Sequence, residues 1–598
     1  MPERADRAVA APLAGCILLA LAAVAACGAP GQVEAEVSRC LERLPGAEVV
    51  ALPAGPERLE LAPDQGITPS ELRGVALDDS PPRLGRPAEP YPPKMTDGFP
   101  PGRAPYVARG IRPFRFRYFH NEFSYGGWHN WAMADYAVTH GFSILFPYNH
   151  AIEGWEHLPE GTRWLKWGGF VDWPRWLPEH GIPEGRYDRL ARLDVAALLR
   201  REEIFGPNPG FHYLMIDMEH PVLDPEELRQ QPWFPAGAAG HLCLAAMRAY
   251  YDGYAKTYTA PVRAARDAGW HNISVYGWQP FRRTYWGLEE ARVHPATHWP
   301  WTAFGRRIYE AVDVLNPSVY CFYWTPRNVA YVLANIDLNM KLVRSMPQRK
   351  PVRPYFWTLL HGGGGGWRWW RGQPIRDQDV RAMTALAFFT GIDGIVLWNW
   401  SGTGNHHRPA LQHKDPQTGQ WVCHDVMVGE PFERTAEGAA RPTRFVRYDA
   451  LHVLSVEEGA VRFQRIRKDD PGANYGVGDE MPVYAMGRDE LLPRLRAKSE
   501  PVAAMVEGLA LAKAFEYILR HGEVHIDVPA QEQFAEQRPI VRRVALGRFH
   551  LLATYDPLWT EQGQPRQVVL DDFAGHEGLT LVVPADAQTR LFVLKGPP

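Results

Sequence analysis

Between about residue 111 and residue 400, short apolar segments alternate about seven times with segments of helical periodicity. Each apolar segment is hydrophobic nearly throughout, as expected of a strand in a parallel sheet that is covered on both faces. Repeated strand–helix alternation over this length predicts a (β/α) barrel of the TIM type with seven or eight strands. The predicted strands are FRFRYFH (114–120), FSILFPY (142–148), HYLMIDME (212–219), ISVYGW (273–278), PSVYCFYW (317–324), VRPYFWTLL (352–360) and DGIVLWNW (393–400).

The connecting segments are predicted to be helical, and no nucleotide-binding motif accompanies them. Neither a GxGxxG nor a Walker sequence follows any of the strands, which disfavours a nucleotide-binding fold. A Trp-rich loop is expected after residue 148. Helices are expected near 127–139, 190–204, 238–268, 302–312, 326–346 and 377–390.

The barrel is predicted to be one part of a larger chain. We expect it to span 111–525, with a polar, turn-rich insertion at about 402–498. The insertion contains one hairpin-like piece (450–466), and a strongly amphipathic helix at 501–522 follows it. Alternating apolar runs over 530–598 predict a small C-terminal β-sandwich-like domain.

The N-terminus has the features of an export signal. Residues 8–26 (AVAAPLAGCILLALAAVAA) are small and apolar, and Cys27 follows directly. The run resembles a bacterial lipobox, which implies cleavage before Cys27 and lipidation of that residue. The alternatives are a plain cleaved signal and an uncleaved anchor. We therefore expect residues 1–27 to be a signal peptide, 28–110 to be a Pro-rich N-terminal segment, and the protein to be a cell-envelope lipoprotein or secreted.

Composition narrows the classes of partner. A net charge of −3 and 45% hydrophobic residues are typical of a soluble globular protein, and nucleic acid is not an expected partner. The chain is rich in aromatic residues, with 22 Trp, 24 Tyr and 25 Phe. Aromatic faces pack against sugar rings, although a large core would also use many of them. The cysteines are widely spaced with no CxxC, so we predict no metal and no cofactor.

Side chains at the carboxyl ends of barrel strands face the active site in this fold. The residues at the predicted strand ends are acidic, polar and aromatic, with almost no Lys or Arg. Such a lining favours a neutral, hydroxyl-rich ligand such as a carbohydrate over a phosphate. The candidate site residues are Glu122, Tyr148, Asn149, Asp217, Glu219, Tyr276, Trp278, Tyr320, Trp357 and Trp398.

Asp217 and Glu219 form the most specific pattern among them. Side chains alternate along a strand, so these two carboxylates point to the same face, roughly 6–7 Å apart. Two like charges this close disfavour double ionisation, so one group keeps its proton more readily. A protonated carboxylic acid can protonate the leaving oxygen of a glycosidic bond. A salt-bridge network and half of a metal site remain as alternatives.

Five short motifs, in the same order along residues 111–400, resemble the hyaluronidase-type glycoside hydrolases. The first is the Asp-x-Glu strand end. The motifs are IDMEHP (216–221), SVYGWQP (274–280), LNPSVY (315–320), KPVRPYFW (350–357) and GIDGIVLWNW (391–400).

The resemblance implies a substrate-assisted mechanism. Glu219 would be the general acid/base, and Asp217 would hold a 2-acetamido group whose carbonyl oxygen attacks the anomeric carbon. Tyr276 and Tyr320 would hydrogen-bond the substrate, and Trp398 would form a wall beside the sugar.

The sequence departs from the family at Met218, where the family usually has Trp, and in lacking the family's disulfide cysteines. We therefore expect an exported glycosidase that acts on a polysaccharide, with N-acetylhexosamine as a candidate unit. The alternative is a non-catalytic glycan-binding lipoprotein.

Overall fold

The structure is a computed structural model. It describes residues 30–44, 46–82, 110–125, 136–146, 159–170, 208, 210–217, 225–231, 234, 240–277, 301–322, 326–361, 375–399, 412–414, 421–423, 427–428, 448–456, 460–466, 483–487, 501–558 and 563–597.

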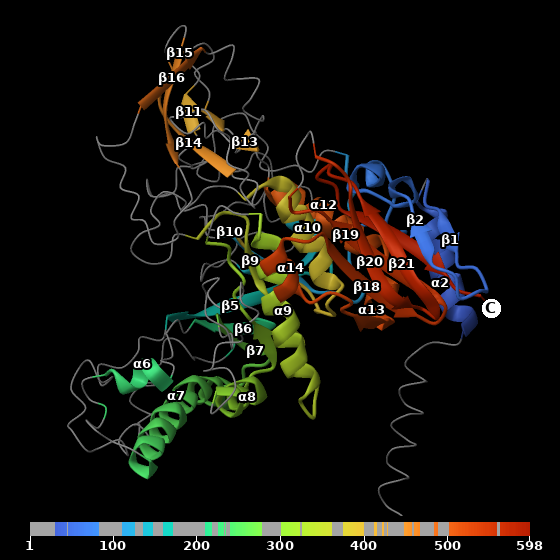
Figure 1. The fold of residues 1–598 in the computed structure, drawn as a ribbon. Coiled ribbons are helices and arrows are strands. Elements are labelled where there is room, and N and C mark those ends of the chain that lie inside the picture. The colour runs from blue at the N-terminus through green and yellow to red at the C-terminus, as the bar shows by residue number, and fades with distance from the viewer. Residues whose placement is uncertain are drawn as a thin grey trace, which may run out of the picture.

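Eight parallel strands of the described chain form one sheet, in the order β8-β7-β6-β5-β4-β3-β10-β9 (Figure 1). Single parallel bridges from Leu315 to Val352 and from Ser318 to Tyr355 join the two ends of this order. The predicted (β/α) barrel is thereby confirmed, with eight strands. They are β3 (Asn121–Tyr125), β4 (Phe142–Phe146), β5 (Arg163–Phe170), β6 (Tyr213–Asp217), β7 (Ile273–Tyr276), β8 (Val314–Asn316), β9 (Tyr355–Trp357) and β10 (Val396–Asn399).

The first strand differs from the prediction. Residues 114–120 were expected to form it, but β3 begins only at Asn121. The phenylalanines of the earlier segment pack instead against a barrel helix: the ring centroids of Phe116 and Phe119 lie 5.7 and 4.9 Å from that of Phe388. The phenylalanines of the segment are buried in the core outside the barrel, and their spacing resembled that of a strand.

Two further strands also differ from the prediction. β5 lies in the stretch expected to be a Trp-rich loop, and its sequence RWLKWGGF mixes charge, glycine and aromatic residues. β8 (Val314–Asn316) ends before the predicted segment 317–324 begins. Backbone pairing nevertheless continues, because the N–H of Val319 donates to the carbonyl of Tyr355 at 3.0 Å.

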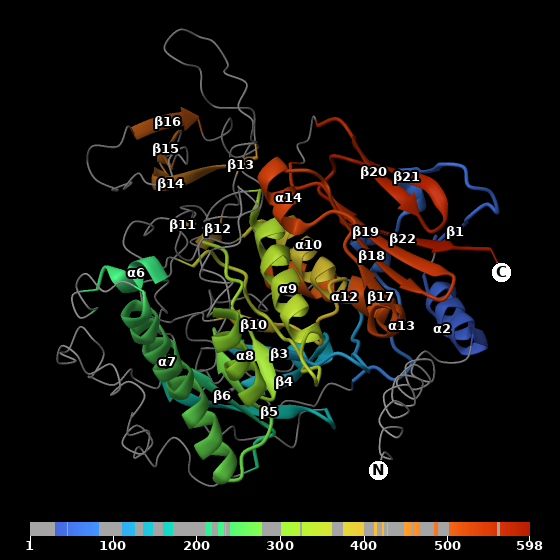
Figure 2. The same cartoon turned by 60° about the horizontal axis from the view of Figure 1, so that its bottom comes forward.

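Helices cover the outside of the barrel (Figure 2). The predicted helices near 238–268, 302–312, 326–346 and 377–390 are confirmed, and residues 136–139 are helical within the predicted 127–139. The predicted helix at 501–522 is divided at Phe515. The helices are α6 (Pro225–Arg229), α7 (His241–Asp267), α8 (Trp301–Ala311), α9 (Asn328–Arg344), α10 (Asp377–Phe388), α12 (Pro501–Ala514) and α13 (Glu516–His521).

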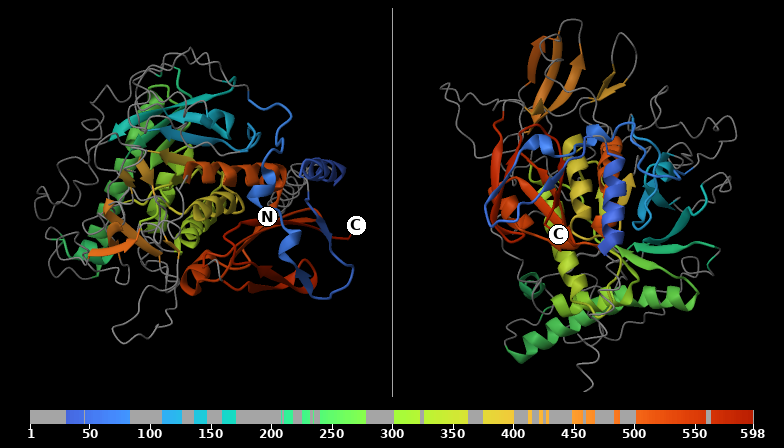
Figure 3. Two further views of the ribbon diagram at one scale, coloured as in Figure 1. Left: turned by 90° about the horizontal axis from the view of Figure 1, so that it is seen from above. Right: turned by 90° about the vertical axis from the view of Figure 1, so that its right-hand side faces the viewer.

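The C-terminal part forms two small sheets, of five strands in the order β1-β22-β19-β18-β17 and three in the order β2-β21-β20. The predicted C-terminal strands are present, and the N-terminal segment adds β1 and β2 to them, which the sequence did not predict (Figure 3). The elements are α2 (Pro30–Glu42), β1 (Val49–Ala51), β2 (Leu59–Leu61), η1 (Pro63–Gln65), η2 (Pro69–Leu72), β17 (Glu523–His525), α14 (Ala530–Glu536), β18 (Ile540–Leu546), β19 (Phe549–Tyr555), β20 (Arg566–Phe573), β21 (His576–Val583) and β22 (Arg590–Lys595).

Between β10 and α12 the chain forms strands that belong to neither the barrel nor the C-terminal sheets. β14 and β15 pair antiparallel as the predicted hairpin. The strands are β11 (Gln412–Lys414), β12 (Trp421–Cys423), β13 (Met427–Val428), β14 (Tyr448–Val456), β15 (Ala460–Ile466) and β16 (Val483–Gly487).

Buried polar contacts join the C-terminal sheets to the barrel helices. Asp379 of α10 accepts hydrogen bonds from Arg376 at 2.6 and 2.7 Å and from the hydroxyl of Tyr555 in β19 at 2.6 Å. Arg542 of β18 reaches Asp337 of α9 at 3.1 Å. Because a buried charge that loses its partner is costly, these contacts hold the two parts in one relative position.

Two further features concern membrane-spanning helices and the cysteines, and the predicted signal peptide at 1–27 lies outside the described residues. Among the described residues, no helix has the length and apolar character needed to cross a membrane. Cys40, Cys243 and Cys321 are free thiols.

Gly394 allows the chain before β10 to approach the chain before β3. A Cβ atom at Gly394 would lie 2.3 Å from the carbonyl oxygen of His120, and its φ is +157°. We expect Gly394→Ala to lower the free energy of unfolding by about 3 kcal/mol or more, because backbone cannot move aside as a side chain can. Urea unfolding measures the change. Gly31→Ala is the control, since no atom lies within 4 Å of its Cβ position; equal effects of the two substitutions would contradict the close-approach argument.

Candidate functional site

The inner face of the barrel follows from strand alternation. In β6, Leu214 and Ile216 belong to the large core outside the barrel, whereas Tyr213 and Met215 belong to a separate inner cluster. Asp217, the last residue of β6, continues the inner side of this alternation. The inner cluster consists of Ile144, Phe146, Leu165, Tyr213, Met215, Tyr276, Tyr320, Phe322, Tyr355, Trp357 and Val396, with Leu359 and Trp398 partly buried against it.

Several predicted site residues meet on this inner face. Tyr276 closes β7, and its ring centroid lies 6.1 Å from that of Tyr320. Tyr320 lies in turn 5.7 Å from Trp357, which closes β9. Trp398 of β10 stands level with Trp357 in the parallel register. Four predicted aromatic residues therefore form one group at the carboxyl ends of the strands.

Asp217 belongs to the same end of the barrel. It is partly buried and directly follows Ile216, which pairs with Val275, the residue before Tyr276. The structure thus brings the predicted Asp217 beside the predicted tyrosine. Glu219, Tyr148, Asn149, Trp278 and the proposed lipidation residue Cys27 lie outside the described residues.

Tyr355 is central to the group, and sequence reasoning missed it. Its ring centroid lies 4.8 Å from that of Tyr276 in an edge-to-face arrangement, and 6.4 Å from that of Trp398. Burial raises the pKa of Tyr355 well above its ordinary value, and Glu122, Tyr276 and Asp217 add to the rise. The phenol therefore stays protonated at neutral pH, so its hydroxyl has a proton to donate in a hydrogen bond. Tyr355 was not a candidate because it does not end a predicted strand. It is two residues before Trp357 in β9 and therefore faces the same side of the sheet.

Glu122 lies inside β3, where a strand end was expected. Its side chain is 1% exposed, and the hydroxyl of Tyr355 donates to its Oε1 at 3.5 Å. Burial raises its pKa to about 7, against the lowering effects of Arg353 and of the hydrogen bond from Tyr355. In the parallel register, Val396 of β10 pairs with Glu122 of β3 and with Tyr355 of β9. These three residues therefore lie one layer below Trp398. Through its hydrogen bond with Tyr355, Glu122 contacts the aromatic group from within the barrel.

A polar layer fills the barrel nearer the amino ends of the strands. The Arg163 guanidinium donates to the hydroxyl of Tyr213 at 2.8 Å, and Arg353 lies over the Tyr213 ring, 4.8 Å from its centroid. Burial and the nearby Arg163, Arg353 and Arg520 together lower the pKa of His120 to about 4, against the opposing effect of Asp393. The barrel interior therefore changes from cationic at the amino ends to aromatic and acidic at the carboxyl ends.

His361 adds an aromatic face that follows β9. Its ring stacks on Tyr320 with centroids 5.5 Å apart and an angle of 17° between planes. Trp357 and Phe322 meet it edge-on, at 5.3 and 5.2 Å. Among the residues that the structure describes, no group of three His, Cys, Asp or Glu side chains is arranged to hold a metal ion.

No protein-family profile and no curated protein sequence matches the chain. Solved structures that match include bee venom hyaluronidase in complex with a hyaluronic acid tetramer, 20% identical over 39% of this chain and 72% of that chain, with a TM-score of 0.27. An alpha-amylase from Geobacillus thermoleovorans complexed with acarbose is 7% identical over 80% and 99% of the two chains, with a TM-score of 0.33.

A GH18 chitinase from Pseudoalteromonas aurantia is also similar, with 15% identity over 44% and 89% of the two chains and a TM-score of 0.23. All three are glycoside hydrolases. Because every TM-score is below 0.5, the assignment of the barrel rests on the strand order of this chain.

The buried Glu122 predicts a specific dependence of stability on pH. Between pH 4.5 and about 7 the folded protein keeps a proton on Glu122 that the unfolded chain has released. The free energy of unfolding therefore falls as pH rises through this window, by about 3 kcal/mol in total, and stays lowered above it. Glu122→Gln lacks this titration, so we expect a flatter profile.

Urea unfolding of both proteins at several pH values from 4.5 to 8 measures the difference. Parallel profiles would show that Glu122 titrates near its ordinary value in the folded protein.

Proposed function

We propose that the protein is a glycoside hydrolase that cleaves a polysaccharide containing N-acetylhexosamine, with Glu219 as general acid/base and Asp217 assisting. The observation that carries the proposal is the position of Asp217. It ends a barrel strand on the inner face, beside Tyr276 and within a group of buried aromatic rings. A carboxylate surrounded by tyrosine hydroxyls and indole rings suits a sugar, whose hydroxyls need hydrogen bonds and whose C–H faces pack on rings.

The proposed reaction uses no nucleophile from the protein. The protonated Glu219 gives its proton to the glycosidic oxygen as the bond to the anomeric carbon breaks. The acetamido oxygen of the same sugar bonds to that carbon, and Asp217 accepts a hydrogen bond from the acetamido N–H. Water, deprotonated by Glu219, then opens the cyclic intermediate and restores the acetamido group.

The aromatic group would hold the sugar during these steps. Tyr276 and Tyr320 belong to the inner cluster and would provide hydroxyls, and Trp398 is only partly buried against that cluster and would provide a ring face. Tyr355, which stays protonated, would keep Tyr276 in place through edge-to-face packing at 4.8 Å. A lining of neutral donors favours neutral sugar hydroxyls over a phosphate.

We expect Glu219→Gln to lower hydrolysis of a responsive N-acetylhexosamine polysaccharide by about 100-fold or more, because the substitution removes the transferable proton. Binding of the same polysaccharide should be retained, since Gln keeps the shape of Glu. Reducing-end release measures hydrolysis, and affinity electrophoresis measures binding. The control is Glu160→Gln, an exposed glutamate. If the wild-type protein binds the polysaccharide but does not hydrolyse it, the result supports a glycan-binding lipoprotein instead. If Glu219→Gln hydrolyses the polysaccharide as fast as the wild type, Glu219 has no part in the mechanism.

We also propose that the protein is exported and anchored through a lipid on Cys27. The apolar run before Cys27 supports this proposal. In a bacterial host, Cys27→Ser should abolish incorporation of radiolabelled palmitate and release the protein from the membrane fraction. Cys40→Ser is the control, because Cys40 is a free thiol in the folded part of the chain. Palmitate labelling that persists in Cys27→Ser would place the anchor elsewhere.

A further inference from the structure

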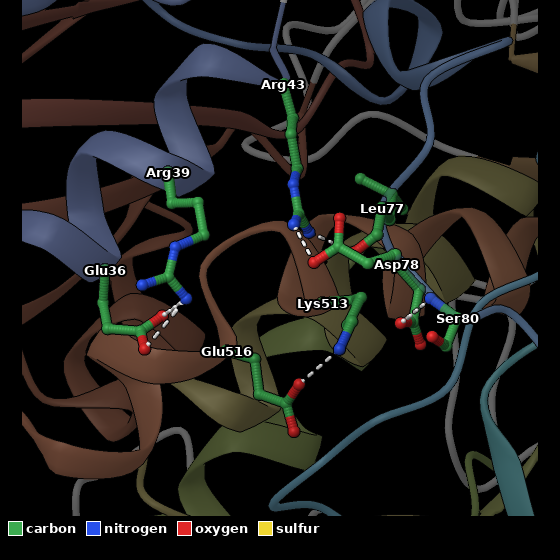
Figure 4. Close-up of polar contacts among 9 residues, drawn as sticks. Glu36, Arg39, Arg43, Leu77, Asp78, Ser80, Lys513 and Glu516 are labelled. Atoms are coloured by element: carbon green, nitrogen blue, oxygen red, sulfur yellow. Dashed lines mark hydrogen bonds and ion pairs between the residues drawn. The ribbon is translucent and has the colours of Figure 1, made fainter.

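A cavity of about 460 Å³ lies between the N-terminal helix and the outer side of the barrel (Figure 4). Its walls come from α2, from residues 77–80, from residues 115–118, and from residues 513–517 at the junction of α12 and α13. Residues 115–118 precede β3, so the cavity lies near the amino ends of the strands. It is therefore separate from the candidate site at their carboxyl ends.

The lining of this cavity is rich in charge, with one more cation than carboxylates. Phe116, Tyr118 and Tyr517 contribute aromatic rings. The carboxylates are Glu36, Asp78, Asp79 and Glu516, and the cations are Arg39, Arg43, Arg115, Arg117 and Lys513.

Three of the cations are paired with acids. Arg39 lies 3.2 Å from Glu36 on the same helix. Arg43 pairs with Asp79 at 2.5 Å. Figure 4 shows Lys513 bonded to Glu516, at 2.7 Å. These pairs use three of the four carboxylates in the lining.

The fourth carboxylate, Asp78, is occupied by backbone. It accepts the N–H of Arg115 and the N–H of Ser80, each at 3.1 Å. Within the described part of the chain, the guanidinium groups of Arg115 and Arg117 have no carboxylate partner. Arg117 is exposed and lies 5.1 Å from the centroid of the Tyr118 ring.

Two further titratable groups near the cavity, His521 and Cys40, are uncharged at neutral pH. The His521 ring packs against Tyr118 and Tyr517, with centroids 5.1 and 4.6 Å apart. Burial lowers the pKa of His521, and the nearby Arg520 and Arg117 lower it further. Cys40 adds no negative charge, since burial raises the pKa of its thiol to about 11.

We propose that this cavity binds a small oxyanion, either free or carried on a sugar ring, which pairs with Arg115 and Arg117. Guanidinium groups form two parallel hydrogen bonds to carboxylate, phosphate or sulfate. A concave site with excess positive charge and low-dielectric walls concentrates anions. The rings of Tyr118 and Tyr517 provide apolar surface for the C–H face of a sugar that carries the anion.

Calorimetric titration of the full chain at low ionic strength tests the proposal with three probes: inorganic phosphate, glucuronate and glucose. We expect phosphate, glucuronate or both to bind, and glucose not to bind. The double variant Arg115→Gln/Arg117→Gln should weaken anion binding by about tenfold or more, because it removes both guanidinium groups that would form charge-assisted hydrogen bonds to the anion. Arg112→Gln is the matched control, since Arg112 is exposed on the same segment and does not line the cavity.

The outcomes separate the two sources of the anion. Binding of both anions means that a free oxyanion is sufficient, whereas binding of glucuronate alone means that the sugar ring contributes. If neither anion binds, if glucose binds as well as glucuronate, or if the double variant binds like the wild type, the proposal is wrong. Arg117→Gln alone repeats the test with a single exposed side chain if the double variant unfolds.

Discussion

A closed ring of eight parallel strands forces half of every strand's side chains into a narrow interior. The space inside such a ring is only wide enough for side chains, so each inward residue contacts others from several strands. In this protein the outward half of the strands is apolar and joins the core beneath the helices. The inward half contains tyrosines, tryptophans and several charged groups. The arrangement of the candidate site follows from this division.

The interior is graded along the barrel axis. Arg163 and Arg353 surround Tyr213 near the amino ends of the strands, and Tyr355 connects Glu122 to the aromatic layer above. Asp217 lies beyond these layers, at the carboxyl ends of the strands. Glu122 and Asp217 both raise the pKa of Tyr355, because charges interact strongly in a low-dielectric interior.

The N-terminal segment contributes more than an extended connection. It supplies two edge strands to the C-terminal sheets and places α2 beside the end of α12. The charged cavity exists only because these distant parts of the chain meet. Its arginines belong to segments that show no functional motif in the sequence, so no pattern along the chain pointed to them.

Patterns along the chain were enough to predict the barrel, most of its helices, and the grouping of Asp217, Tyr276, Tyr320, Trp357 and Trp398. Strand periodicity and the rule that parallel strands end on one face are local properties, and they leave few alternatives. The true start of the first strand, the presence of β5, and the importance of Tyr355 required the folded structure. Residues 114–120 have phenylalanines at the spacing of a strand, and only the position of Phe388 shows that the rings of Phe116 and Phe119 lie outside the barrel. Likewise, burial by neighbours on other strands is what raises the pKa of Glu122, and a sequence does not state which residues will surround a side chain.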